Sequence, residues 1–339
     1  MRQNIFRKAG VAGLVCAAIS LLAGAPCRAD DEDTQKVITK SFAAEPGGSV
    51  SVITDQGDIE LVTGSQDAAE VRVERTVAGA TDSQAASILK KNKVTASLEG
   101  KTLYVEVRST KVSPAKLAEL SVHIRVTVPR RFEAQLETEG GTIEATGLQG
   151  GVEAKTSAGD MAFAHIHGPV SGQSAGGNIR VTGGTGKLQV HTSGGTISIK
   201  DYTGPGAQAD SLGGDIEVTG CTGPLTAKTS GGNITVENFT GPQAGADSGG
   251  GTIALDLASA LLADSFFRTT GGNITVKMTD NVAVNLLAMT DGGTITTAVP
   301  VSATTKGRIQ EGKLEGTING GGPKLMLKTG GGNIEILKK

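Results

Sequence analysis

The sequence contains no tryptophan, few other aromatic residues and little proline: among 339 residues there are 7 phenylalanines, 2 tyrosines and 10 prolines. Glycine is abundant, at 50 residues, but it does not recur at every third position, which excludes a collagen triple helix. With 37% hydrophobic residues and a net charge of −2, the chain is unlike intrinsically disordered proteins. The balanced charge also lacks the basic excess of nucleic-acid-binding proteins, so we expect no nucleic-acid partner.

The first 29 residues are predicted to be a secretory signal peptide. A basic segment at residues 2–8 precedes an apolar stretch at residues 9–25, and an acidic block follows at residues 30–33. Cleavage fits after Ala29 and almost as well after Cys27. No later apolar run reaches the roughly 18 residues that a membrane-spanning helix needs. We therefore expect an exported chain, in the periplasm, at the outer membrane or outside the cell, with no membrane span once the signal is removed.

Three cysteines are present, and two of them, Cys16 and Cys27, belong to the predicted signal peptide. Acylation of Cys27 would make the protein a lipoprotein, an alternative that the poor match of residues 24–26 to a lipidation motif disfavours. Only Cys221 remains in the mature chain, so a fold held together by disulfides is excluded. Cys221 is expected to be a buried, unreactive thiol.

A short motif, Gly-Gly-x-Ile, recurs through the chain after residue 139. Six of the ten gaps between successive copies are 18 or 19 residues long, and the full range is 16 to 23. Such spacing indicates a repeat architecture in which each unit packs on its neighbours. The apolar residue that ends the motif marks the copies: Ile143, Met161, Ile179, Ile197, Ile216, Ile234, Ile253, Ile274, Ile295, Ile318 and Ile334.

Every copy follows one template, numbered from that apolar residue as position 0. Position −2 is always glycine, and position −5 is serine or threonine except in the Ile318 copy, which has Lys313. Positions −9, −7, 0 and +2 are mostly apolar, which predicts two short strands per copy, each with one buried face. The predicted fold is all-β: a single-chain parallel β-helix (β-solenoid) with coils of 18–19 residues.

Two rows of the template have expected structural roles. The invariant glycine requires either a positive φ or a close approach of two backbones. The Ser/Thr row is expected to line an inner corner, with hydroxyls that bond from coil to coil. Its members Thr192, Ser211 and Thr229 should therefore lie one above another.

The same template fits once near the start, from Val50 to Leu61. The chain then leaves the array through predicted strands at 70–77, 94–98, 102–107 and 120–128 and a short helix at 82–91, an excursion expected to cover the N-terminal end. The C-terminal coil is expected to end at residues 336–339 without a cap. The predicted organisation is a signal peptide (1–29), N-terminal strands with the first coil and the excursion (30–130), and regular coils (131–339) that continue the same domain.

Three segments resemble the bacterial putative-adhesin family, a set of exported, glycine-rich β-solenoid domains of unknown function. They are PGGSV at residues 46–50, VHIRVTVP at 122–129 and TSGGNI at 229–234. The resemblance covers nearly the whole mature chain. It implies a secreted or envelope-associated repeat protein without catalytic activity, and it supplies no catalytic residues to transfer to this sequence.

Two patterns suggest metal sites, and both are weak. His165 and His167 flank the inward-facing Ile166 and are expected to point outward together, but a transition-metal site needs a third ligand. Position −1 resembles calcium-binding turns, yet it alternates among Asp, Asn and Thr, as at Asp160 and Asp215, so carboxylates do not align on adjacent coils. A turn-forming role is favoured there. We predict no metal, no cofactor and no catalytic residues.

Position −6 forms an outward row of charged and polar residues: Lys155, Gln173, His191, Asp210, Lys228, Asp247 and Arg268. Opposite charges on adjacent coils should pair, each contributing about 0.2–1 kcal/mol, and a ligand-binding face is the alternative. Carbohydrate-binding surfaces usually present exposed aromatic rings. Five aromatic residues fall mostly in predicted core rows, which disfavours a glycan-binding adhesin: Phe132, Phe163, Tyr202, Phe239 and Phe267.

These observations predict a non-catalytic exported repeat protein that offers an adhesive, binding or scaffolding surface in the bacterial cell envelope, to an envelope component or a surface ligand. Two alternatives stay open. A polysaccharide-active β-helix lyase or hydrolase would need acidic or basic residues of neighbouring coils to converge in a groove. A self-assembling envelope rod would associate end to end through the bare C-terminal edge.

Overall fold

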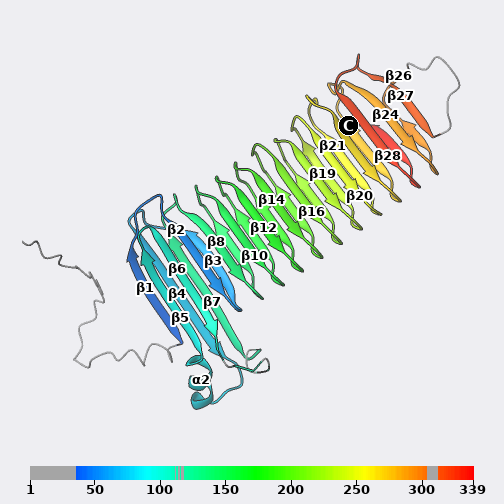
Figure 1. Cartoon of the computed structure of the whole chain (residues 1–339). Coiled ribbons are helices and arrows are strands. Elements are labelled where there is room, and N and C mark those ends of the chain that lie inside the picture. Colours follow the sequence, from blue (N-terminus) through cyan, green and yellow to red (C-terminus); the bar gives the residue numbers. More distant parts are fainter. Residues whose placement is uncertain (1–35, 111, 114, 116–117, 304–311) are drawn as a thin grey trace, which may run out of the picture.

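The computed structural model describes residues 36–110, 112–113, 115, 118–303 and 312–339. The predicted signal peptide, with Cys16 and Cys27, lies outside these residues. Within them, no helix has the length and hydrophobicity needed to cross a membrane. The described residues form an elongated rod of stacked β-strands with one short helix, α2 (Asp82–Leu89), at one end (Figure 1).

The rod consists of two sheets that face each other across the apolar interior. Sheet A has 14 strands, in the spatial order β1 (Val37–Ala43), β4 (Ala68–Val77), β7 (Leu120–Val128), β3 (Asp58–Thr63), β9 (Ile143–Thr146), β11 (Met161–Ala164), β13 (Ile179–Thr182), β15 (Ile197–Lys200), β17 (Ile216–Thr219), β19 (Ile234–Phe239), β21 (Ile253–Leu257), β23 (Ile274–Met278), β29 (Ile334–Lys338) and β25 (Ile295–Thr297).

Sheet B has 15 strands, in the spatial order β5 (Asn92–Glu99), β6 (Thr102–Ser109), β2 (Ser49–Thr54), β8 (Glu133–Thr138), β10 (Val152–Thr156), β12 (Val170–Ser174), β14 (Leu188–Thr192), β16 (Ala207–Ser211), β18 (Leu225–Thr229), β20 (Ala244–Ser248), β22 (Ser265–Thr269), β28 (Lys324–Thr329), β24 (Val284–Thr290), β27 (Lys313–Ile318) and β26 (Ser302–Ala303).

The predicted β-solenoid is confirmed, because the template positions stack in register. Each regular coil contributes one strand to each sheet, and consecutive coils pair in parallel. In sheet B, Thr192 pairs with Ser211, and Ser211 pairs with Thr229. In sheet A, Ile197 pairs with Ile179 on one side and with Ile216 on the other. Alternation along each short strand buries positions −9, −7, 0 and +2, so the rows of the sequence become continuous ridges of the core.

The Ser/Thr row does bond from coil to coil, but its partners are glycines rather than other hydroxyls. The buried Thr192 hydroxyl donates to the carbonyl oxygen of Gly177 on the preceding coil, at 2.8 Å, and accepts the N–H of Gly195 on its own coil, at 3.3 Å. The same pair of bonds recurs at Ser174, which joins Gly159 and Gly177. Each hydroxyl thus satisfies a buried donor and a buried acceptor at the corner.

Close backbone approach explains the invariant glycine at position −2. A Cβ built on Gly195 would lie 2.2 Å from the carbonyl oxygen of Gly177, a distance that no side chain tolerates. The φ angle of Gly195 is not positive, so steric room and not left-handed backbone selects glycine there.

The segment from β4 to β7, together with β1, covers the N-terminal end of the rod. Strands β6 and β7 stack outside the first coil, β2–β3, and beyond them β4 and β1 extend sheet A while β5 extends sheet B, all three antiparallel to their neighbours. Helix α2 packs against β4 and β5. The buried Arg75 of β4 donates to the carbonyl oxygens of Leu89, at 3.3 Å, and Asn92, at 2.5 Å, where a cation complements the C-terminal end of the helix.

The C-terminal end differs from the prediction in two ways. The last coil, β28–β29, lies between β22–β23 and β24–β25, so β29 has a paired neighbour on each side and the predicted bare edge at residues 336–339 is wrong. The Ile318 copy of the repeat is not a coil: it lies in β27, which pairs with β24 in the antiparallel direction. The end of the rod is formed by the three-residue strand β25 and by β26–β27, short elements typical of a protected sheet edge.

Candidate binding groove on the outer face of sheet B

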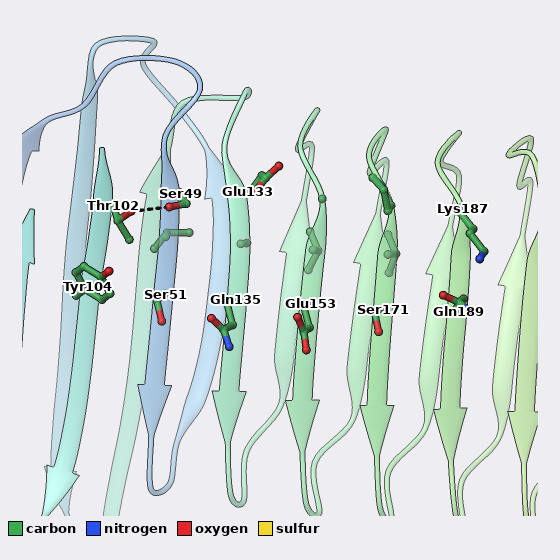
Figure 2. A pocket seen from close by; sticks show the side chains of 16 residues that line it. Ser49, Ser51, Thr102, Tyr104, Glu133, Gln135, Glu153, Ser171, Lys187 and Gln189 are labelled. Atoms are coloured by element: carbon green, nitrogen blue, oxygen red, sulfur yellow. Dashed lines mark hydrogen bonds between the residues drawn. The ribbon is translucent and has the colours of Figure 1, made fainter. Parts of the chain in front are cut away.

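A shallow groove of about 600 Å³ crosses the outer face of sheet B between β6 and β14. One row of outward side chains, at template position −8, runs along it on six consecutive strands. Each member of the row pairs in register with the next, and Figure 2 shows the six side chains on their neighbouring strands. From one end to the other the row is Tyr104, Ser51, Gln135, Glu153, Ser171 and Gln189.

A second row, at the starts of the same strands, borders the groove. Ser49 pairs with Thr102, and their hydroxyls lie 2.9 Å apart (Figure 2). Glu133 follows on β8, and Lys187 lies at the far end before β14. Between them stand Gly151 and Pro169, whose lack of long side chains leaves the surface hollow.

Tyr104 is the aromatic residue of the groove, and it is not among the residues that the sequence patterns singled out. Its side chain is 45% exposed, whereas its strand neighbours Leu103 and Val105 are buried. The sequence does contain a signal for the exposure of Tyr104. In the predicted strand 102–107, side chains alternate between the two faces, so Tyr104 points outward when Leu103 and Val105 point inward. The five aromatic residues assigned to core rows are indeed buried, but Tyr104 supplies the exposed ring that those rows do not.

The two carboxylates of the groove, Glu133 and Glu153, come from adjacent strands. The Glu153 carboxylate lies 2.6 Å from the ammonium group of Lys155, and this hydrogen bond raises the pKa of Lys155. About half of each of these two side chains is exposed, so water screens the pair. Glu153 is therefore a half-exposed, ion-paired carboxylate at the middle of the row.

His165 and His167 follow β11 and are both exposed. His165 has a left-handed backbone, with φ of 54°, and its ring packs over Gly183 on the next coil. The Nδ1 atom of His167 lies 3.2 Å from the Thr185 hydroxyl. Among the described residues no three His, Cys, Asp or Glu side chains gather into a potential metal site, and the two imidazoles gain no third ligand from that part of the chain.

The position −1 row has a backbone-capping role. The Asp160 carboxylate accepts the N–H of Asn178 on the next coil, at 2.7 Å, and the Asn178 side-chain oxygen accepts the N–H of Thr196, at 2.9 Å. The shorter threonine side chain carries a hydroxyl in place of the amide or carboxylate oxygen, and after Thr196 the series starts again at Asp215. The same order recurs at Asp215, Asn233 and Thr252. The turn-forming interpretation is thus supported by contacts that a bound cation would have to displace.

The position −6 row is in register, with His191, Asp210 and Lys228 directly opposite one another on β14, β16 and β18. Within residues 118–303, however, no ion pair joins two members of the row. Lys155 pairs within its own strand, with Glu153. The guanidinium group of Arg268 instead lies over the Phe266 ring, 5.3 Å from its centroid.

Beyond β20, the position −8 row becomes apolar. Phe266, Met326 and Leu287 follow one another on β22, β28 and β24, and all three are partly buried. The Phe266 ring covers Gly245 of β20, where an added Cβ would lie 2.7 Å from the ring. At this end of sheet B, the outward side chains pack against one another and leave no polar groove. The polar groove is therefore restricted to the N-terminal half of sheet B.

Cys221 is buried, as expected, and burial raises the pKa of its thiol. It shares a core row with Tyr202, whose hydroxyl donates to the carbonyl oxygen of Gly186. Burial raises the pKa of Tyr202 to about 12. Neither group faces the groove.

The family model described as Toastrack DUF4097 matches residues 173–337. This part of the chain is therefore similar to the Toastrack family. The match confirms the family resemblance stated from the sequence. The matched region contains β13 to β28 in full, whereas most of the groove, from Ser49 to Ser171, precedes it.

Several solved structures are similar to this chain over most of its length. They include a putative adhesin from Parabacteroides distasonis ATCC 8503, with 14% identity, coverage of 89% of this chain and 97% of that chain, and a TM-score of 0.44. A putative adhesin from Parabacteroides merdae ATCC 43184 has 13% identity, 89% and 96% coverage, and a TM-score of 0.43. A putative lipid binding protein from Parabacteroides distasonis ATCC 8503 has 12% identity, 89% and 97% coverage, and a TM-score of 0.40. No curated protein matches the chain.

Proposed function

We propose that this protein is a non-enzymatic, exported binding protein of the bacterial cell envelope, and that the groove of sheet B holds its ligand. The observation that carries the proposal is the row of six polar, outward side chains on consecutive strands, from Tyr104 to Gln189. Side chains on a sheet keep fixed spacings, which suits recognition of an extended ligand. The ligand would be an envelope component or a molecule on a neighbouring surface.

A pair of matched double variants tests the proposal. Gln135→Ala/Gln189→Ala removes two amides from the groove. Gln208→Ala/Thr226→Ala removes two side chains from the same row on β16 and β18, outside the groove. We expect the first variant to bind isolated envelopes at least fivefold more weakly than the wild type, and the control to bind normally. Equal binding by all three proteins would refute the role of the groove, and cytoplasmic fractionation of the chain would refute the envelope location.

A polysaccharide-active enzyme is the second candidate, because the groove brings Glu133 and Glu153 together from neighbouring strands. Two carboxylates flanking a sugar are the minimum for glycoside hydrolysis. The exposure of Glu153 and its ion pair with Lys155 argue against an enzyme, since the general acid of a glycosidase lies in an apolar pocket that excludes water. Release of reducing ends from a polysaccharide, abolished by Glu153→Gln, would establish the enzyme and overturn the binding-only proposal.

A further inference from the structure

Polar side chains repeat at a regular spacing along the groove. Six consecutive strands each place one polar side chain at position −8, and the register runs continuously from β6 to β14. Neighbouring strands lie about 4.8 Å apart, so the row is roughly 24 Å long and runs along the rod. A ligand that uses the whole row must be a linear chain that crosses the strands and presents similar groups at short, regular intervals.

The chemical groups of the row further restrict the class of ligand that can bind. Three of its side chains carry hydroxyls, two carry amides and one is a carboxylate. Hydroxyls and amides both donate and accept hydrogen bonds, so they complement a chain that is itself covered with hydroxyls. The carboxylates of Glu133 and Glu153 disfavour polyanions such as nucleic acids or strongly acidic glycans, because like charges would be brought together.

Other classes of extended ligand fit less well. An acyl chain would cover the amides, hydroxyls and carboxylate of the row between Tyr104 and Gln189 and leave them without hydrogen-bond partners. An extended peptide advances about 3.3 Å per residue and directs its side chains alternately to opposite sides, so it falls out of step with strands about 4.8 Å apart. Tyr104 adds an exposed aromatic ring with a polar tip at the end of the row, an amphipathic surface suited to stacking against the C–H face of a sugar ring.

From these observations we infer that the groove binds a neutral linear oligosaccharide, which lies along the rod across β6 to β14 with one sugar ring stacked on Tyr104. The inference rests on the proposed function, since it names the ligand class of the same surface. It also assigns residues: Tyr104 provides the stacking platform, and Gln135 and Gln189 provide the hydrogen bonds that fix the chain's path.

Calorimetric titration of the purified protein with cellohexaose, maltohexaose and chitohexaose tests the inference. At least one hexasaccharide should bind, and its trisaccharide should bind at least tenfold more weakly because it covers only part of the row. Tyr104→Ala should weaken binding of the hexasaccharide about tenfold, and Tyr104→Phe, which keeps the ring, less than threefold. Gln189→Ala should weaken it about fivefold, the loss of one hydrogen bond, while the control Gln208→Ala should bind normally.

The results of these titrations distinguish an error in the ligand class from an error in the proposed function. The inference is overturned if none of the three sugars binds, or if binding is unchanged in Tyr104→Ala and Gln189→Ala. If no sugar binds but the groove variants still lose attachment to envelopes, the ligand class is wrong and the proposed function stands. If a polar extended peptide binds to the groove in place of the sugars, the ligand is a protein segment. Since these side chains all face solvent, circular dichroism of each variant should match the wild type.

Discussion

Replacing Gly195 with alanine should destabilise the rod, because the added methyl group has no room. It would lie 2.2 Å from the carbonyl oxygen and 2.4 Å from the carbonyl carbon of Gly177, both backbone atoms that cannot rotate away. The two coils must separate locally by about 1 Å to reach ordinary van der Waals distance. That separation weakens the bond from Thr192 to Gly177, now 2.8 Å, and the nearby backbone bond from Ile179 to Thr196, now 2.9 Å.

The expected loss combines overpacking, about 1–3 kcal/mol, with two weakened hydrogen bonds of about 0.5–1.5 kcal/mol each. We expect a total loss of about 2–6 kcal/mol in the free energy of unfolding, measured by urea denaturation. Gly194→Ala is the matched control: its methyl group would lie 3.6 Å from Gly176, an ordinary contact, so the change should stay within about 0.5 kcal/mol of the wild type. Equal stability of the two variants would show that close approach does not select glycine at position −2.

Three further predictions concern the rows that hold the coils together. Thr192→Val keeps the shape of the side chain but leaves the carbonyl of Gly177 and the N–H of Gly195 without partners, so it should lower the free energy of unfolding by about 1–3 kcal/mol. Thr192→Ser should recover most of the loss, and equal stability of the Val and Ser variants would contradict the hydroxyl's role. Asp160→Ala should lower the free energy of unfolding by about 0.5–1.5 kcal/mol in the same assay, whereas Asp160→Asn should be nearly neutral, because Asn178 accepts the same kind of bond on the next coil. A destabilised Asn variant would indicate that the charge of Asp160 contributes to stability. Burial raises the pKa of Tyr202 from 10.0 to about 12 in the folded protein, so Tyr202 ionises first in the unfolded chain and stability should fall between pH 10 and pH 12. Tyr202→Phe should remove that part of the pH dependence, and identical pH profiles of the two proteins would contradict burial as the cause.

The sequence alone predicts the coils because their periodicity is local. Every regular coil repeats the same alternation around a glycine, so Thr192, Ser211 and Thr229 fall in register without any knowledge of the rest of the chain. The hydroxyls' true partners could not be predicted in this way. The template places Thr192 three residues before Gly195, but it does not show that the carbonyl of Gly177 lies directly beneath.

The order of the coils at the two ends is not local information. The coils at Ile295 and Ile334 both satisfy the template, and nothing in the repeat says which of them stacks on the coil at Ile274. In the structure it is Ile334 that pairs with Ile274, while Ile295 pairs with the far side of Ile334. The antiparallel strand β27, which has lysine where the repeat has serine or threonine, holds β24 at the end.

The groove depends on the same long-range order. Tyr104 borders Ser51 only because the excursion returns β6 to the outer side of β2, and Gln135 borders Ser51 only because β8 pairs with the opposite side of β2. The groove thus joins three separate stretches of chain. Period-2 alternation could identify Tyr104 as outward, but not its neighbours.

The position of β28–β29 has a consequence for biosynthesis. Coils between Ile143 and Ile274 find their native partners in the order in which the ribosome makes them. The segment from Val284 to Thr297 cannot, because the strands it rests on are translated after it. Closure of this end of the rod therefore waits until β28 and β29 have been made. Without β28 and β29, the strands β22 and β23 on one side and β24 and β25 on the other would lose the coil that separates them, and their apolar faces would be open to water.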